Sequence, residues 1–533
     1  EARYPDDAPV PLEDLQRCIE TLRRLKGTRK GSDDGFAFYD GPCCRELRKA
    51  VAPFAARMQR KMFNGASRSE YEEKKAVKRQ VEARASQQRE LDKQHVQKAA
   101  IRHGRLERLA ELQRQGEHLP LVADGTVEVP DCLEQKPSTS HELNSPRACY
   151  TCKKRFYLLH HFYSDLCSEC ASLNWQKRNQ ECDCRGKIAL VTGGRVKIGF
   201  QVVAKLLRWG AHVIVTTRFP RDCAQRLAAQ AELEGTQWAD RLDIYGLDFR
   251  DLASLEAFCA FCIKQYPRLD ILINNACQTV RRPVGFYRHL MDGEASSQSL
   301  SSGQHRMLEQ FHGWRSSQPE IGVAGLASLP ASATAPPATT DLPAAYQKVA
   351  RSATLSQVEL VPEDASTQFP QGVLDTNGQQ VDLRLRNTWV MKLEEIETAE
   401  LAEVFLINAM APFILNSRLQ QLLERGGGEP KVVVNVSAME GKFYRVKAPY
   451  HPHTNMAKSA LNQLTRTVAC DLAKKQIFMC AVDTGWINDE NPLEKARRYS
   501  EEHNFQCPLD EIDAAARILD PVVVSLSGGE PLF

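Results

Sequence analysis

The chain has 533 residues, of which 42% are hydrophobic and 26% are charged. This composition is ordinary for a globular protein and excludes a collagenous or wholly disordered chain, and the length allows two to four domains with at least one large core. The formal net charge of +3 does not by itself indicate a nucleic-acid partner, although the basic residues gather in the first third of the chain.

The sequence contains no apolar run of 18 or more residues, so we expect no membrane span. Its 17 cysteines are too few for a disulfide scaffold, and four of them form two Cys-x-x-Cys pairs. That usage indicates an intracellular, reducing compartment and metal binding. The sequence begins at Glu1 rather than Met, which either a removed targeting peptide or a trimmed N-terminus would explain.

Residues 1–65 are expected to form a helical N-terminal region, with one helix ending near Leu25 and another from Glu46 to Met62. Residues 66–117 then predict one long charged helix, because Gly and Pro are almost absent between Ser67 and Gln115. No heptad is sustained there. The helix is either a solvated, salt-bridged rod or an arm along a partner, with RNA contact as one option because basic residues outnumber acidic ones.

Residues 118–148 contain four prolines and predict a linker. Residues 149–184 follow as a small module in which two Cys-x-x-Cys pairs are separated by 14 residues. Each pair can supply two corners of a tetrahedron, so the spacing predicts a closed structural Zn²⁺ site. The four expected ligands are Cys149, Cys152, Cys167 and Cys170. His160 or His161 could replace one cysteine, and Cys182 with Cys184 is a weaker alternative pair.

Residues 185–533 are expected to form the main domain. Its first stretch, Gly186–Gly199, reads as a buried strand, a glycine turn and the start of a helix. This layout is typical of a dinucleotide-binding βαβ unit, in which glycines let the backbone approach a pyrophosphate at a helix N-terminus. The next strand ends at Arg218, where NAD-binding units often carry an acidic residue. A basic residue suits a 2′-phosphate and favours NADP, with NAD as the alternative, and Arg195 and Lys197 add positive charge.

Later motifs follow in an order that resembles the short-chain dehydrogenase/reductase family. The resemblance rests on Thr192, Gly193, Ile198 and Gly199 in the turn, Asp248 after the third strand, Asn274 and Ala276 after the fourth, Asn408 on a later helix, Ser437 after the fifth strand, and Lys458 on the next helix. It covers roughly residues 185–525 and implies an α/β fold with a doubly wound, parallel Rossmann sheet. The same turn and strand-end residues, with Lys458, are implied to hold the cofactor.

In that family a tyrosine four residues before the lysine transfers the proton. A serine orients the substrate carbonyl, the lysine lowers the pKa of the tyrosine and holds the nicotinamide ribose, and an asparagine supports a water relay. The resemblance thus implies hydride transfer with Ser437, Lys458 and Asn408 in those roles. Four residues before Lys458, however, the chain has Thr454. Tyr450 or His453 could serve as a substitute acid.

Three further positions depart from the family pattern. Lys197 replaces the middle glycine of the turn, Cys277 replaces the glycine of Asn-Asn-Ala-Gly, and Thr484-Gly485 replaces Pro-Gly. An insertion at about 288–383, rich in Ser, Ala, Gln and Pro, enters after the fourth strand. Its composition predicts mostly loop.

Two functions remain open on this sequence. The first is an NADP-dependent oxidoreductase with an altered proton donor. The second is a non-catalytic subunit of a large protein or ribonucleoprotein assembly, such as a mitochondrial ribosome or respiratory complex. In that case residues 1–148 and the insertion would contact the partners, and the location would be mitochondrial rather than cytoplasmic. The sequence contains no residues that identify a substrate.

Overall fold

The structure is a computed structural model of the chain, and it describes residues 9–25, 40–62, 67–105, 142–296, 300–317, 349–365, 368–370, 379–425, 427–488 and 490–533. The chain divides into two units, residues 1–91 and 92–533. The end of the predicted long helix (106–117), most of the predicted linker (118–141) and the centre of the insertion (318–348) lie outside the described residues.

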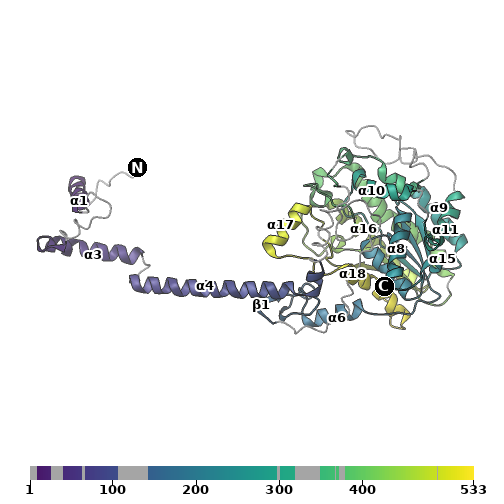
Figure 1. Ribbon diagram of the computed structural model, residues 1–533, viewed down its shortest axis with the longest axis horizontal. Helices are drawn as coiled ribbons and strands as arrows, with labels where there is room; N and C mark the ends of the chain where they lie inside the picture. The colour runs from purple at the N-terminus through teal and green to yellow at the C-terminus, as the bar shows by residue number, and fades with distance from the viewer. Residues whose placement is uncertain are drawn as a thin grey trace. The chain divides into compact units, whose positions relative to one another are not determined.

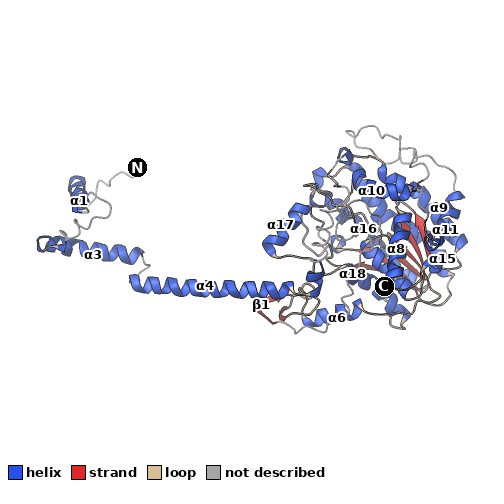
Figure 2. Ribbon diagram, in the orientation of Figure 1, coloured by secondary structure: helices blue, strands red, loops and turns tan. Residues whose placement is uncertain are grey.

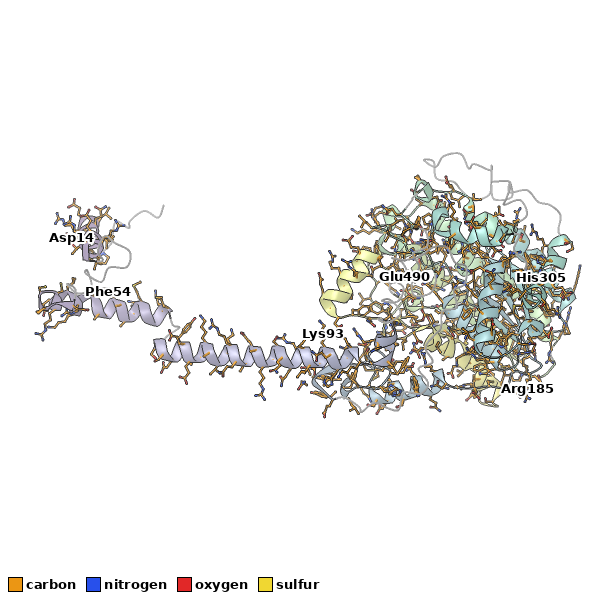
Figure 3. All side chains as sticks on the ribbon, in the orientation of Figure 1. Asp14, Phe54, Lys93, Arg185, His305 and Glu490 are labelled. Carbon is orange, nitrogen blue, oxygen red and sulfur yellow. The ribbon has the colours of Figure 1, made fainter. Side chains whose placement is uncertain are left out.

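In its described parts, the first unit contains helices and no strands (Figure 1). They are α1 (Leu12–Leu25), α3 (Arg45–Met62) and α4 (Arg68–Gln97), and the last residues of α4 already belong to the second unit. The side chains of α4 stand out from the ribbon along its length (Figure 3), and those of residues 69–91 are mostly exposed. The predicted helices are therefore present, and the sequence of α4 suits an exposed helix because it is dominated by charged and polar residues.

The prediction of one continuous helix to Gln115 is wrong, because α4 ends at Gln97 and a turn follows before residues 100–105 become helical again. The cause lies in the cysteine module. The backbone N–H groups of Ala100 and Ile101 donate to the carbonyls of His161 and Phe162 at 3.0 and 3.2 Å. These bonds replace the i→i−4 bonds that a continuous helix would need.

The cysteine module is a hairpin followed by a helix: β1 (Glu142–Ala148) pairs antiparallel with β2 (Arg155–Leu158), and α6 spans Ser168–Arg178. The end of the predicted linker is thus a strand, so that boundary is corrected to residue 142. The hairpin escaped prediction because β1 is polar, with Leu143 as its one buried residue.

The main domain contains a six-stranded parallel sheet in the order β5-β4-β3-β6-β7-β8. Its strands are red in Figure 2. The strands are β3 (Ile188–Thr192), β4 (His212–Thr217), β5 (Leu242–Gly246), β6 (Ile271–Asn274), β7 (Lys431–Ser437) and β8 (Ile477–Asp483). Continuous apolar runs form them because helices cover both faces of the sheet. The strand order reverses between β3 and β6, which confirms the doubly wound fold and locates its switch point.

Helices connect and cover these strands (Figure 1). They are α7 (Lys197–Arg208), α8 (Pro220–Leu233), α9 (Leu252–Gln265), α10 (Val284–Ala295), α11 (Ser302–Ser316), α12 (Arg351–Thr354), α13 (Thr398–Phe405), α14 (Ala411–Arg418), α15 (Gln420–Glu424), α16 (Pro452–Ala473), α17 (Leu493–His503) and α18 (Glu511–Leu526), with a π turn at Leu406–Met410. Short 3₁₀ turns lie at Pro42–Cys44, Ala239–Arg241, Leu355–Gln357, Pro362–Ala365, Thr388–Val390, Leu393–Glu395 and Met439–Gly441.

Part of the insertion is more ordered than its composition predicts. Helix α11 begins with a capping box between Ser301 and Gln304, and it buries Leu308, Phe311 and Trp314 in the same core as β5. These apolar residues recur at helical spacing, so the pattern was present but masked by the surrounding Ser and Gln residues. The prediction of loop is wrong for Ser302–Ser316.

One described helix, Thr398–Arg418, is long and apolar enough to cross a membrane, and 44% of its most apolar window is buried inside the domain. Glu403 within this helix is buried and binds the guanidinium groups of Arg250 and Arg281, each at 2.9 Å. A buried carboxylate with two ionic partners places this segment among the core helices of the domain, and the expectation that no segment spans a membrane stays a prediction.

Truncating a side chain of the central strands is expected to destabilise the domain strongly. Leu272 on β6 is fully buried, so Leu272→Ala should lower the free energy of unfolding by about 2–5 kcal/mol through lost contacts and a residual cavity. Leu233→Ala, at the exposed end of α8, should change it by less than about 0.5 kcal/mol. Urea unfolding followed by circular dichroism measures both, and equal losses would contradict the assignment of β6 to the core.

Candidate dinucleotide cleft and cysteine cluster

The glycine turn lies at the carboxyl end of β3, at the switch point of the sheet. Gly193 has a φ of +70°, and its N–H donates to the carbonyl of Thr216 on β4 at 2.8 Å. A Cβ on Gly199 would lie 2.1 Å from the Gly193 carbonyl oxygen, so only glycine fits there. Helix α7 then begins without a side-chain cap, which leaves its first N–H groups available to an anion.

Lys197 adopts the left-handed conformation that glycine adopts readily, with a φ of +54°. For a non-glycine residue this costs about 1 kcal/mol, so the lysine keeps the turn geometry at some cost. Its Nζ lies 3.8 Å from the Glu490 carboxylate, and Arg282 lies 3.9 Å from the other oxygen of the same group. The Lys197 side chain thus extends from the turn to the chain that follows β8.

Thr192 and Asn275 tie the turn to the end of β6. The Thr192 hydroxyl accepts the N–H groups of Asn275 and Ala276, both at 2.9 Å. The Asn275 amide donates to the carbonyls of Thr192 and Gly193 at 2.9 and 3.2 Å. Asn275 was missed by our sequence analysis, although its place in the Asn-Asn-Ala motif could have indicated it. Asn274 has a different role, because its amide donates to Asn416 and Asn435 in the interior.

The basic residues predicted to hold a 2′-phosphate already have internal partners. Arg195 is buried and binds Asp222 at 2.7 Å. Arg218 donates to the Tyr287 hydroxyl at 2.7 Å, and its guanidinium carbon lies 4.4 Å from the centre of that ring. Each guanidinium has five N–H donors, so one such bond leaves donors for a phosphate. Tyr287 belongs to α10, and the sequence pattern did not link it to Arg218.

Asp248 is the buried partner of Arg250, at 2.7 Å. Burial acts to raise the pKa of Asp248, but the Arg250 charge and hydrogen bonds outweigh it and hold this pKa below its ordinary value.

The insertion lies against the ends of strands β4 and β5. Ser352 donates to the carbonyl of Arg218 at 2.9 Å, and Arg250 donates to that of Leu355 at 2.9 Å. The described part of the insertion therefore forms one wall at the ends of β4 and β5.

Two of the predicted catalytic residues, Ser437 and Lys458, come together at the carboxyl end of β7. Lys458 Nζ donates to the Val436 carbonyl at 2.8 Å, directly before Ser437. The Ser437 hydroxyl is buried and has no hydrogen-bond partner among the described residues. The Thr454 hydroxyl on α16 is likewise buried, and no described residue satisfies it. A buried hydroxyl without a partner is costly in a finished fold, so a ligand or a bound water would complete these bonds.

Asn408 lies in the π turn, a kind of helix irregularity that often marks functional sites. Its side chain accepts the N–H of Gln278 at 2.8 Å and donates to the carbonyl of the same residue at 3.0 Å. The π turn thereby links its helix to the chain after β6.

The two substitute acids lie in different surroundings. The ring of His453 is buried beside Glu400 on α13, with Nε2 3.3 Å from the carboxylate, so it belongs to the contact between two helices. Tyr450 is half-buried in the loop before α16, and Lys495 of α17 lies 5.8 Å from its ring centre. Between them His451 stacks on Trp389 at 3.9 Å, a contact that our sequence analysis did not foresee.

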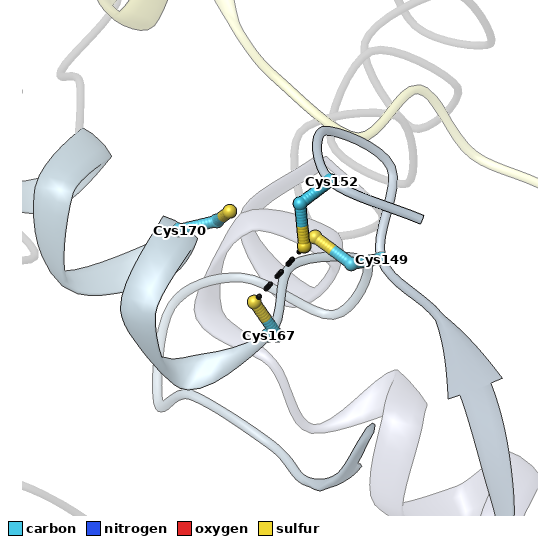
Figure 4. Close-up of side chains that lie close together, drawn as sticks. All are labelled: Cys149, Cys152, Cys167 and Cys170. Atoms are coloured by element: carbon cyan, nitrogen blue, oxygen red, sulfur yellow. Dashed lines mark hydrogen bonds between the residues drawn. The ribbon is translucent and has the colours of Figure 1, made fainter. Parts of the chain in front are cut away.

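The four cysteines of the module converge (Figure 4). Their sulfur atoms all lie within 4.8 Å of one another, and those of Cys152 and Cys167 are 3.6 Å apart. Burial acts to raise the pKa of the Cys149 thiol, but hydrogen bonds from the N–H groups of Cys167, Cys152 and Thr151 outweigh it and lower the pKa to about 6. The surroundings of Cys149 thus favour a thiolate, the form that binds metal, whereas burial and the neighbouring cysteines raise the pKa of the Cys167 and Cys170 thiols.

The alternative ligands are not part of this group in the described chain. His160 Nδ1 accepts the N–H groups of Phe162 and Tyr163 at 3.1 and 3.4 Å. The His161 ring packs edge-on against Trp175. Cys182 and Cys184 lie beyond α6 and take no part in the cluster.

Comparison with known families supports the assignment of the cleft. Residues 187–291 match the model for short chain dehydrogenases, and residues 384–519 match the model named enoyl-(acyl carrier protein) reductase. The two matches together contain every strand of the sheet and lie on either side of the insertion. Residues 187–291 and 384–519 therefore belong to a domain of the short-chain dehydrogenase/reductase family.

Individual relatives match smaller parts. Uncharacterized protein R665 of Acanthamoeba polyphaga mimivirus is 27% identical over 71% of this chain and 72% of its own. Carbonyl reductase [NADPH] 1 of Sus scrofa is 41% identical, but over 17% of this chain and 30% of its own length. This chain therefore spans less than a third of that reductase. Among solved structures, the Pseudomonas aeruginosa RhlG/NADP active-site complex is 18% identical over 66% of this chain and 93% of its own, with a TM-score of 0.37.

Within this short-chain dehydrogenase/reductase domain, replacing the last glycine of the turn is expected to break its geometry. In Gly199→Ala the new Cβ would meet backbone atoms that cannot move aside, so the free energy of unfolding should fall by about 1–3 kcal/mol. Gly293→Ala is the matched control, since a Cβ there meets nothing within 4 Å and alanine favours helix α10 by about 0.5–1 kcal/mol. Thermal melting compares the two, and a stable Gly199→Ala protein would refute the close approach.

Proposed function

We propose that the protein is an NADP-dependent oxidoreductase that transfers hydride between the nicotinamide and a carbonyl or alcohol. The observation that carries this proposal is the pair of buried hydroxyls, Ser437 and Thr454, that lack partners beside Lys458. Ser437 ends β7, at the same sheet edge as the glycine turn after β3, and Thr454 lies one helical turn before Lys458 on α16. This is the edge at which open α/β sheets bind their ligands.

The residues present fit a dinucleotide. Gly193 and Gly199 allow close backbone approach, and the uncapped start of α7 faces the same turn. Lys197, Arg195 and Arg218 would supply positive charge for the phosphates. When bound, the cofactor supplies or accepts the hydride. The printed name of carbonyl reductase [NADPH] 1 is consistent with NADP, and the basic residue Arg218 directly after β4 argues against NAD.

The protein side of the reaction would be positioning and proton transfer. Ser437 would hydrogen-bond the substrate oxygen, and Lys458 would hold the nicotinamide ribose. Asn408 would support a water relay through its π turn. Threonine is a far poorer acid than a phenol of pKa about 10. We therefore assign the proton to Tyr450, with Thr454 as a hydrogen-bonding group in the family tyrosine's place.

The cysteine cluster would hold a structural Zn²⁺. Four thiolates fill all tetrahedral positions and leave none for substrate, which separates this site from the redox chemistry of the cleft. Four converging sulfurs are the softest ligand set that proteins offer and suit zinc.

A second candidate is the non-catalytic subunit of a large assembly, such as a mitochondrial ribosome or respiratory complex. It is favoured by Thr454 and by exposed apolar side chains on the N-terminal helices. Leu15, Ile19 and Leu22 form one row on α1, and Phe54 and Met58 begin another on α3. The basic helix could then contact RNA within an intracellular, mitochondrial particle. Intact NADPH binding without any turnover, together with co-sedimentation in a large particle, would favour this candidate.

Cofactor preference tests the role of Arg218. Arg218→Ala should weaken NADPH binding by roughly tenfold or more, because a charged hydrogen bond contributes about 1.5–3 kcal/mol, while NADH binding stays unchanged. Tyr287→Phe removes the internal partner of Arg218 without removing its charge and should preserve the preference. Fluorescence titration with both cofactors measures this, and an equal loss for NADPH and NADH in Arg218→Ala would contradict the 2′-phosphate contact.

Turnover tests the catalytic assignment. In NADPH oxidation with a panel of aldehydes and ketones, Ser437→Ala and Tyr450→Phe should each lower kcat by about 100-fold or more while NADPH affinity stays near that of the wild type. Tyr444→Phe, an exposed tyrosine in the same loop, is the control and should keep full turnover. If Thr454→Val abolishes turnover and Tyr450→Phe does not, the proton donor is wrongly assigned.

A further inference from the structure

The cysteine module shares a hydrophobic cluster with the chain that follows β8. We call residues 484–488 and 490–510 the post-β8 segment. Two of its side chains, Ile487 and Leu509, are buried in the same cluster as Phe162, Tyr163 and Leu166 of the module. Both parts belong to the second unit of the chain. The post-β8 segment therefore shares part of its core with residues of the cysteine module.

One direct bond joins the cysteine cluster to the start of this segment. Tyr150 lies between Cys149 and Cys152, and its hydroxyl accepts the N–H of Trp486 at 2.8 Å. The neighbouring Gly485 has a φ of +81°, and a Cβ there would lie 3.4 Å from the same hydroxyl. The hydrogen bond from Trp486 therefore links this part of the segment to the loop that carries the first cysteine pair.

Further bonds hold the far end of the segment. Arg102, in the helical residues docked on the module, donates to the Asn504 carbonyl at 2.6 Å. Arg178 at the end of α6 binds Asp510 at 2.6 Å, and Asp510 caps helix α18. The Tyr163 hydroxyl donates to Asp513 at 2.5 Å. The module thus contacts the post-β8 segment near both of its ends.

The first part of the segment reaches the cleft through Glu490. Glu490 lies 3.8 Å from Lys197 of the glycine turn and 3.9 Å from Arg282. Its backbone carbonyl accepts the Asn387 amide at 2.9 Å. The contacts that hold the two ends of the segment therefore also position Glu490 beside the glycine turn of the dinucleotide cleft.

We propose that a zinc-like metal ion, held by Cys149, Cys152, Cys167 and Cys170, positions the post-β8 segment over the cleft. The two cysteine pairs come from the hairpin turn and the start of α6, and the metal is the link that fixes these two parts to each other. Loss of the metal would loosen the module and, through Tyr150 and the shared cluster, the segment. The consequence for cofactor binding rests on the proposed function, whereas metal binding and segment order do not.

Three full-length variants separate the steps of this argument. Cys152→Ser removes one ligand, Tyr150→Phe removes the bond to Trp486 but keeps all four thiols, and Cys470→Ser replaces an exposed cysteine on α16 as the control. Elemental analysis measures bound metal, and hydrogen–deuterium exchange with mass spectrometry measures order in residues 484–510. Titration with NADPH measures the cleft.

The wild type and Cys470→Ser should carry one zinc per chain and exchange slowly. Cys152→Ser should lose the metal, and its segment should exchange at least about tenfold faster, as expected when a local opening becomes easier. Tyr150→Phe should keep the metal and exchange faster only around Trp486. Both variants should bind NADPH several-fold more weakly than the wild type.

A wild-type protein that stays metal-free after incubation with zinc would overturn the proposal. So would metal loss without faster exchange in the segment. If Cys152→Ser does not fold, removing zinc from the wild type with a chelator gives the same comparison. A wild type that binds zinc but not NADPH would refute the proposed function, while the link between metal and segment would still be measured by exchange.

Discussion

The close contact between Gly199 and the Gly193 carbonyl is the constraint on which the cleft depends. It fixes the angle at which α7 leaves β3, because any side chain at residue 199 would force the helix away from the sheet. The start of α7, the Thr192 hydroxyl and the Asn275 amide are all arranged around this contact. Ile198 in the same turn packs against both the main core and the module's cluster, so the constraint extends to both.

Much of the domain could be predicted from the sequence because its strands are buried on both faces. An apolar run such as Val432–Val436 predicts a central parallel strand, because both of its faces must be buried. The glycine and asparagine motifs at the strand ends indicate which edge of the sheet binds ligands. The cysteine spacing likewise predicted four sulfurs that do converge. The roles of Ser437, Lys458 and Asn408 remain predictions, although the structure brings Ser437 and Lys458 together.

The remainder depended on contacts between residues far apart in the chain. Arg102 bonds Asn504, 402 residues later, and no local pattern could have shown this. The break after α4 exists because Ala100 and Ile101 find acceptors on the module, which overrides a strongly helical sequence. In the same way, Arg218 has its partner on α10, and Asp248 has its partner two residues further along the chain. The sequence placed Arg218 and Asp248 at the ends of strands but did not show which residues they bind.

The domain contains both a buried ionic network and a partly exposed ion pair at the glycine turn. Arg250 and Arg281 share Glu403, and Arg281 also binds Asp364 of the insertion, so a buried ionic network ties the insertion to α13. Such networks contribute little net stability. Removing one partner, however, leaves a buried charge and costs about 3–5 kcal/mol, so the remaining partners hold one another in a fixed geometry.

Lys197 is in a different environment, since its side chain is partly exposed and its Nζ lies 3.8 Å from the Glu490 carboxylate. A pyrophosphate at the glycine turn would carry more negative charge than one carboxylate and would lie nearer the backbone amides. On the proposed function, Lys197 would exchange Glu490 for a phosphate at little cost. Its left-handed backbone keeps the turn geometry of a glycine, while its side chain would add a positive charge for the phosphate.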